Sequence, residues 1–143
     1  MATFKSFEEI EVWQKARSLA DKIYGLTIEG SFAKDYKLKD QINGSSGSIM
    51  DNIAEGFERD GTREFIQFLS IAKGSTGEVR SQLYRALDRS HISEDVFKSL
   101  LEETLQITRQ LTSLMRYLGK SGIKGNKFIS EPDQNYGIEE SQT

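Results

Sequence analysis

The sequence contains no cysteine, one histidine and one proline. Without cysteine the chain can form no disulfide framework, no thiolate metal centre and no thiol nucleophile. The single histidine, His91, cannot supply the two Glu-x-x-His pairs of a di-iron site in a helical bundle. The single proline, Pro132, lies near the C-terminus, and its scarcity favours long helices because proline is excluded from helix interiors. We therefore expect an all-α fold with no catalytic residue, no metal and no cofactor.

Long hydrophobic runs are also missing. No apolar stretch approaches the roughly 20 residues that cross a bilayer, and residues 1–6 lack the apolar centre of a signal peptide. The net charge is −3, whereas a dedicated nucleic-acid binder is usually basic or carries a basic stripe. A length of 143 residues suits one domain. The composition predicts a cytoplasmic domain with no membrane partner, and it does not name a function.

The first helical pattern begins with Ser6 and Glu9, which have the spacing of a capping box, and it ends at Gly30. Its apolar positions recur at helical spacing: Ile10, Trp13, Ala16, Ala20, Ile23, Tyr24 and Thr27. Three more apolar residues widen this arc to roughly half of the circumference, beyond the stripe of about 100° on an ordinary surface helix: Val12, Leu19 and Leu26. The width indicates a helix that is central to the fold or shared with another subunit.

The second and third helical patterns are separated by Asp60 and Gly61. The second has an apolar period that keeps its phase across the loop-like residues 43–48, with apolar positions at Leu38, Ile42, Ile49, Ile53 and Phe57. The third begins with Thr62 as its N-cap and ends near His91, which we expect in an exposed turn. Gly74 and Gly77 inside the third pattern suggest the close approach of a neighbouring helix.

The fourth helical pattern begins with Ser93 as its N-cap, and we expect it to stop at Gly119 and Gly122. Four amphipathic helices joined by short connections predict an antiparallel up-down-up-down four-helix bundle over residues 1–119. Residues 120–143 have no periodic apolar face, and we expect them to form a flexible tail.

Several segments resemble one bacterial family. Residues 7–17 resemble its opening helix, residues 52–57 (Asn-Ile-Ala-Glu-Gly-Phe) resemble its most specific string, and the third helix contributes Phe65, Phe68, Gly74, Ser75 and Glu78. The family is that of the four-helix-bundle proteins found in intervening sequences of 23S ribosomal RNA genes. The resemblance implies a homopentameric barrel. One related branch, the accessory protein of diversity-generating retroelements, associates with a reverse transcriptase and with nucleic acid.

The resemblance marks a small set of motif or interface residues: Trp13, Arg17, Asn52, Glu55 and Gly56. Glu55 continues a polar edge of the second helix, which also contains Gln41, Ser45, Ser48 and Asn52. We expect this edge to be a hydrogen-bonded seam that sets register, with Glu55 paired to Arg17. The alternative is a small-molecule site between subunits.

The third helix carries the only local surplus of positive charge: Lys73, Arg80, Arg85 and Arg89 are its candidate nucleic-acid residues. Repeated around an oligomer, they could form a ring that contacts phosphates. The alternative is an ordinary solvated face. Where relatives carry paired arginines in the second helix, this chain has Asn43-Gly44-Ser45-Ser46.

Two functions remain open on the sequence. The first is a non-enzymatic, homo-oligomeric scaffold or adapter, a pentamer by the resemblance, which associates with nucleic acid or with a nucleic-acid enzyme such as a reverse transcriptase. The second is a bundle that interacts only with proteins, which the acidic net charge favours.

Overall fold

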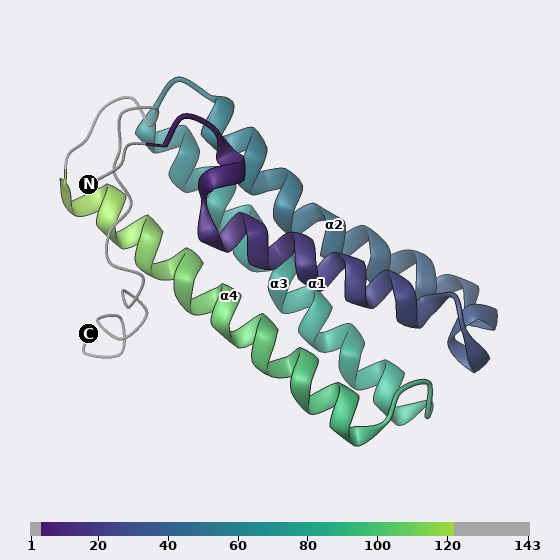
Figure 1. The fold of residues 1–143 in the computed structure, drawn as a ribbon. Coiled ribbons are helices and arrows are strands. Elements are labelled where there is room, and N and C mark those ends of the chain that lie inside the picture. The colour runs from purple at the N-terminus through teal and green to yellow at the C-terminus, as the bar shows by residue number, and fades with distance from the viewer. Residues whose placement is uncertain (1–3, 122–143) are drawn as a thin grey trace.

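The computed structural model describes residues 4–121, and within them it contains four α-helices and no strand. The helices are α1 (Glu11–Thr27), α2 (Tyr36–Glu58), α3 (Thr62–Asp88) and α4 (Glu94–Ser121), and two short 3₁₀ helices, η1 (Phe7–Glu9) and η2 (Gly30–Lys34), precede α1 and α2. The four long helices lie alongside one another in an elongated bundle (Figure 1). The expected four-helix, all-α fold is confirmed. None of the described helices is both long and apolar enough to cross a membrane.

The second helix passes without a break through its glycine- and serine-rich middle, as the apolar period predicted. All five apolar positions of that period are buried: Leu38, Ile42, Ile49, Ile53 and Phe57. The polar side chains in this stretch bond to the helix itself, since the hydroxyl of Ser45 donates to the carbonyl of Gln41 at 3.0 Å. Asn43 donates to the carbonyl of Lys39 at 3.0 Å and to the hydroxyl of Thr27 in α1 at 2.9 Å. Packing and local hydrogen bonds therefore hold a segment whose helix propensity is low.

The start of the first helix differs from the prediction. Ser6 makes no capping hydrogen bond, and the Glu9 carboxylate accepts from the backbone N–H of Lys5 at 3.0 Å, so the capping box is wrong. The chain instead forms η1 and enters α1 at Glu11. Helix α1 ends at Thr27 rather than at Gly30, and Gly30 opens η2 with a φ of +59°, a left-handed conformation that glycine adopts without strain.

The predicted boundaries of the last two helices are mostly correct. The hydroxyl of Ser93 accepts from the N–H of Val96 at 3.2 Å, which confirms its role as the N-cap of α4. Gly61, not Thr62, is the N-cap of α3. Helix α4 continues through Gly119 to Ser121, so the first two residues of the expected tail (120–143) are helical, and residues 122–143 lie outside the described residues.

The wide apolar arc of α1 is absorbed inside the bundle. Val12 and Leu19 are fully buried, and Leu26 packs on the core in part. Val12 and Leu19 therefore do not provide the surplus surface that was expected for a partner subunit, whereas Leu26 stays partly uncovered. Within residues 4–121, five other large apolar side chains remain about half exposed or more, and these are Tyr24, Ile28, Tyr36, Ile71 and Tyr84.

The glycines divide into two kinds. A Cβ added at Gly74 or Gly77 would meet nothing within 4 Å, so the expected close approach of a helix to these positions is wrong within this chain. The close approach occurs at Gly56, where a Cβ would lie 2.6 Å from the Cβ of Phe68 and 3.1 Å from the ring of Phe65. Gly56 thus allows α2 and α3 to pack closely at this point.

We expect Gly56→Ala to lower the free energy of unfolding by about 1–3 kcal/mol, because the added methyl overlaps the stem of Phe68 and forces the helices apart. Gly44→Ala in the same helix is the matched control. It adds its methyl to open space and should raise the free energy of unfolding by up to about 1 kcal/mol. Urea unfolding of the two variants measures both changes, and equal effects of the two substitutions would contradict close packing at Gly56.

Candidate functional site

The four candidate cations of α3 do not form a single patch. At 100° per residue, Arg80 lies about 20° from Lys73 around the helix, whereas Arg85 and Arg89 lie about 120° and 160° away. Arg80 points toward α4, where one guanidinium nitrogen is 3.4 Å from the hydroxyl of Thr108. Lys73 is partly exposed and forms no ion pair with another described residue.

Arg85 and Arg89 are engaged in contacts with other elements. Arg85 donates to the side-chain oxygen of Gln41 in α2 at 2.8 Å. Arg89 donates to the carboxylate of Asp35 at 2.9 Å. Both side chains therefore connect α3 to the start of α2, and this leaves them less available to phosphate than free cations would be.

The polar edge of α2 forms a hydrogen-bonded seam against α3. The hydroxyls of Ser48 and Ser75 share a hydrogen bond of 2.9 Å. Asn52 donates to the carbonyl of Ser48 at 2.8 Å and to its hydroxyl at 2.9 Å. Gly56 continues the seam as the position of closest approach to Phe65 and Phe68. These motif residues link two helices of the same chain, which gives them a structural role in the described bundle.

Glu55 does not pair with Arg17. The Glu55 carboxylate forms an exposed ion pair of 2.8 Å with Arg59, one turn further along α2. Arg17 instead extends over the ring of Trp13, with 5.9 Å between its guanidinium carbon and the ring centroid. Trp13 is buried and packs edge-to-face on Phe7 at 5.1 Å. The motif residues of α1 and α2 therefore belong to separate contacts.

His91 is not an exposed turn residue, because its side chain is only 9% exposed. Its ring stacks on buried Phe32 with 5.0 Å between centroids. Nε2 lies 2.9 Å from a carboxylate oxygen of Asp35, and Nδ1 lies 2.8 Å from the hydroxyl of Ser31. Since an ionised carboxylate can only accept, the ring donates from Nε2 to Asp35, while Nδ1 and the Ser31 hydroxyl share the second hydrogen bond. His91 thus links the turn after α3 to the connection between α1 and α2.

Asp35 is the centre of this polar cluster. One carboxylate oxygen accepts from both His91 and Arg89, and the other accepts from the N–H of Leu38 at 3.4 Å as the N-cap of α2. The hydrogen bonds from His91 and then from Arg89 lower the pKa of Asp35 from 3.8 to about 2. The carboxylate therefore stays charged well into the acid range. Sequence patterns gave no signal for this cluster, which brings together residues more than 50 positions apart.

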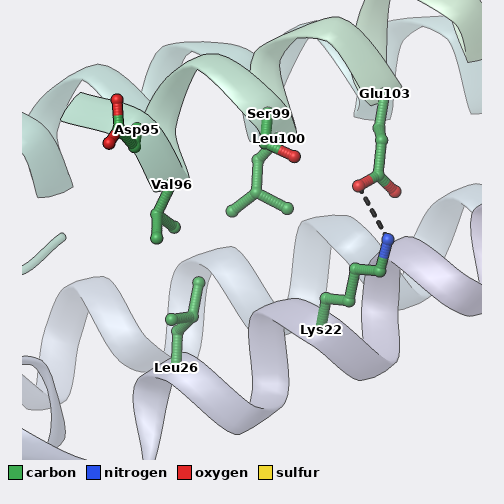
Figure 2. A pocket seen from close by; sticks show the side chains of 7 residues that line it. All are labelled: Lys22, Leu26, Asp95, Val96, Ser99, Leu100 and Glu103. Atoms are coloured by element: carbon green, nitrogen blue, oxygen red, sulfur yellow. Dashed lines mark hydrogen bonds and ion pairs between the residues drawn. The ribbon is translucent and has the colours of Figure 1, made fainter. Parts of the chain in front are cut away.

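A groove of about 460 Å³ lies between α1 and α4. Leu26 of α1 faces Val96 and Leu100 of α4 across it, and an ion pair of 2.9 Å between Lys22 and Glu103 crosses it at one side (Figure 2). Asp95 and Ser99 complete the lining. The groove is mainly apolar with a few polar groups at its margin, the composition typical of binding sites.

A second hollow, of about 650 Å³, lies between α1 and α2. Gln14, Arg17 and Asp21 line it from α1, and Met50 lines it from α2. Neither hollow contains a histidine. In the part of the chain that the structure describes, no group of three metal-ligating side chains occurs.

Comparison with known proteins agrees with the fold. The family model described as 23S rRNA-intervening sequence protein matches residues 8–113. A protein of unknown function from the S23 ribosomal protein family of Bacteroides thetaiotaomicron has a similar solved structure, with a TM-score of 0.67. The two chains are 24% identical, and the match covers 73% of this chain and 98% of the other, which shows a shared fold. No curated protein matches the chain.

The Asp35 cluster makes stability depend on pH. Because the folded-state pKa of about 2 lies below the ordinary 3.8, the charged carboxylate stabilises the fold above pH 3.8, and this contribution disappears as the pH falls through 2. We expect Asp35→Asn, which keeps a capping oxygen, to destabilise the protein at pH 7 and to have much less effect at pH 2. Urea unfolding at both pH values measures this, with Asp51→Asn in the exposed face of α2 as the control. An equal loss at both pH values would show that charge is not the cause.

Proposed function

Because the chain belongs to the 23S rRNA-intervening sequence protein family, we propose that it is a non-enzymatic, self-associating scaffold built on an antiparallel up-down-up-down bundle. The similar solved structure is described as a protein of unknown function, and it contributes the fold alone. The support for self-association comes from the surface of this chain. The pentamer is part of the same proposal, and it rests on the family resemblance.

The observation that carries the proposal is a complete core beside exposed aromatic and aliphatic side chains. Each helix buries its apolar period, and residues such as Ile42, Ile53, Leu69 and Leu111 are fully buried. Yet Tyr36 is 71% exposed, and Tyr24, Ile28, Ile71 and Tyr84 are 48–55% exposed. A cluster of exposed apolar residues is typical of an interaction surface, whereas a single one is ordinary. Three of the five lie at the joined ends of α1 and α2.

A scaffold role agrees with the chemistry of the described residues. The only histidine of the chain is held between Ser31 and Asp35 at the end of the bundle, outside both hollows. An ion pair between Lys22 and Glu103 joins α1 to α4. These arrangements position helices and provide surface, which is what an adapter requires.

We expect a homo-oligomer in solution. Light scattering coupled to size exclusion should give a mass several times the 16.2 kDa of the chain, and five times that mass for the pentamer. An interface that persists at micromolar concentration should bury more than about 1,000 Å² in total. A mass of one chain at this concentration would overturn the proposal of self-association.

A second candidate function is association with nucleic acid or with an enzyme that acts on it, such as a reverse transcriptase. One observation favours it: Lys73, free of ion pairs among the described residues, shares a flank of α3 with Arg80. An oligomer would repeat this pair once in each subunit. Phosphate contacts of this kind carry no base specificity.

We expect any binding to nucleic acid to be weak, independent of sequence and strongly weakened by salt, because counterion release would drive it. Retention on immobilised nucleic acid should fall steeply as salt rises. Lys73→Glu should reduce retention more than Lys98→Glu. The second substitution is the control, because it makes the same charge change at an exposed position of α4. No retention even at low salt would favour a scaffold that binds only proteins.

A further inference from the structure

We propose that the groove between α1 and α4 receives the start of α2 from a second copy of the chain, with Tyr36 as the inserted side chain. This inference rests on the proposed self-association and assigns its interface. We call the acceptor the α1–α4 groove, lined by Leu26, Val96 and Leu100 with Lys22, Asp95, Ser99 and Glu103. We call the donor the Tyr36 knob, formed by Tyr36 with Lys34 and Lys37.

Polar pairs connect α1 and α4 on one side of the α1–α4 groove. Along the length of the bundle, Glu11 pairs with Gln110 at 2.8 Å, and Lys22 pairs with Glu103 at 2.9 Å. Beyond Lys22, toward the start of α4, Leu26 and Val96 are only partly covered, although Leu100 behind them is buried (Figure 2). The volume of about 460 Å³ falls within the range of about 300–1,000 Å³ typical of binding sites.

The Tyr36 knob has the properties of a side chain that lacks its partner. Tyr36 is the first residue of α2 and, at 71%, the most exposed large apolar residue among those that the structure describes. An aromatic ring with a hydroxyl at its tip suits a groove with an apolar floor and a polar margin. Lys34 and Lys37 flank it, both exposed and neither in an ion pair with another described residue.

The charges of knob and groove are complementary. The first turn of α4 carries Glu94 and Asp95, and Asp95 lines the groove. Both acids are exposed, and neither forms an ion pair within residues 4–121. The lysines beside Tyr36 would meet these acids as the ring enters. Charge complementarity of this kind fixes orientation and accelerates association more than it adds affinity.

The positions of knob and groove favour a closed ring. The contact of His91 with Ser31 and Asp35 shows that the α3–α4 turn meets the α1–α2 connection, so Tyr36 and the start of α4 lie at the same end of the bundle (Figure 1). The donor and acceptor surfaces are different, which makes the contact heterologous. A heterologous contact builds a ring when its rotation closes, and a donor and an acceptor at the same level along the bundle are compatible with such a ring.

Two further exposed side chains extend the donor surface. Tyr24 and Ile28 lie about 160° around α1 from Leu26, on the flank turned away from the groove. They are 55% and 48% exposed, and they lie beside the connection that leads to Tyr36. Aromatic side chains of this size bury about 150–250 Å² each. The knob with these neighbours therefore provides a substantial part of the area that a stable interface needs.

The absence of cysteine allows a direct test by disulfide trapping. Tyr36→Cys and Val96→Cys chains are co-expressed, purified and oxidised, and the rate at which the covalent two-chain product forms is measured. We expect this pair to be trapped at least about tenfold faster than Ile71→Cys with Val96→Cys, because a disulfide requires a separation of roughly 3.5–4.5 Å between Cβ atoms. Ile71 is the matched control, a half-exposed apolar residue of α3.

Light scattering on the same mixtures separates the two proposals. An oligomer that forms without the Tyr36–Val96 product would overturn the assigned interface and would leave self-association intact. The groove would then be free for a different partner. A monomer would overturn both. As a second arm, Lys37→Glu should weaken the oligomer, and adding Asp95→Lys to the same chain should restore the association, because every contact of the ring then has opposite charges again. Failure of the restoration would contradict the charge pairing at the groove.

Discussion

The close packing of α2 against α3 is the constraint on which the rest of the structure depends. Helix α2 contains Gly44 and Gly47 in its middle, each costing about 1 kcal/mol relative to alanine, so its sequence would not hold a helix alone. It is held by its buried apolar period, by the hydrogen bond between Ser48 and Ser75, and by the space at Gly56 that admits Phe65 and Phe68. The motif string that carries the family resemblance therefore has a physical reason within a single chain.

The polar cluster around Asp35 plays the corresponding role at the end of the bundle. It joins the turn after α3, through Arg89 and His91, to the connection before α2. The His91 ring stacks on Phe32 and is largely buried, so this contact lies at the edge of the hydrophobic core. Because Asp35 also caps α2, the cluster fixes the position of the next residue, Tyr36, which faces solvent. One rigid end of the bundle thus presents both an exposed aromatic ring and an open groove.

Much of the fold could be predicted from the sequence, because long amphipathic helices carry their own signals. The periodic apolar residues of α2 overrode its loop-like composition, and Ser93 capped α4 as its spacing suggested. Errors arose where the outcome depended on tertiary contacts. Glycine is compatible with either close approach or open space, so Gly56 and Gly74 could not be told apart by sequence. A single histidine in a turn gives no sign of a carboxylate more than 50 positions earlier.

Even less of the candidate site could be predicted from the sequence. The four cations of α3 share a helix but not a face, and the side chains that Arg85 and Arg89 contact come from α2 and its start. The α1–α4 groove depends on how α1 and α4 pack against each other, which no local pattern encodes. The exposure of Tyr36 could not be predicted from the sequence either, since an aromatic residue at the start of a helix can face the core or the solvent.

Tyrosine nitration of the native chain tests the central claim most directly, because it requires no substitution. In an isolated bundle Tyr36, at 71% exposure, should react at least as fast as Tyr84, at 50%. In the assembled protein we expect the opposite order: peptide mass spectrometry should show Tyr36 protected and Tyr84 reactive, with the protection lost on dilution to the monomer. Nitration of Tyr36 as fast as Tyr84 in a sample that light scattering shows to be assembled would contradict the account.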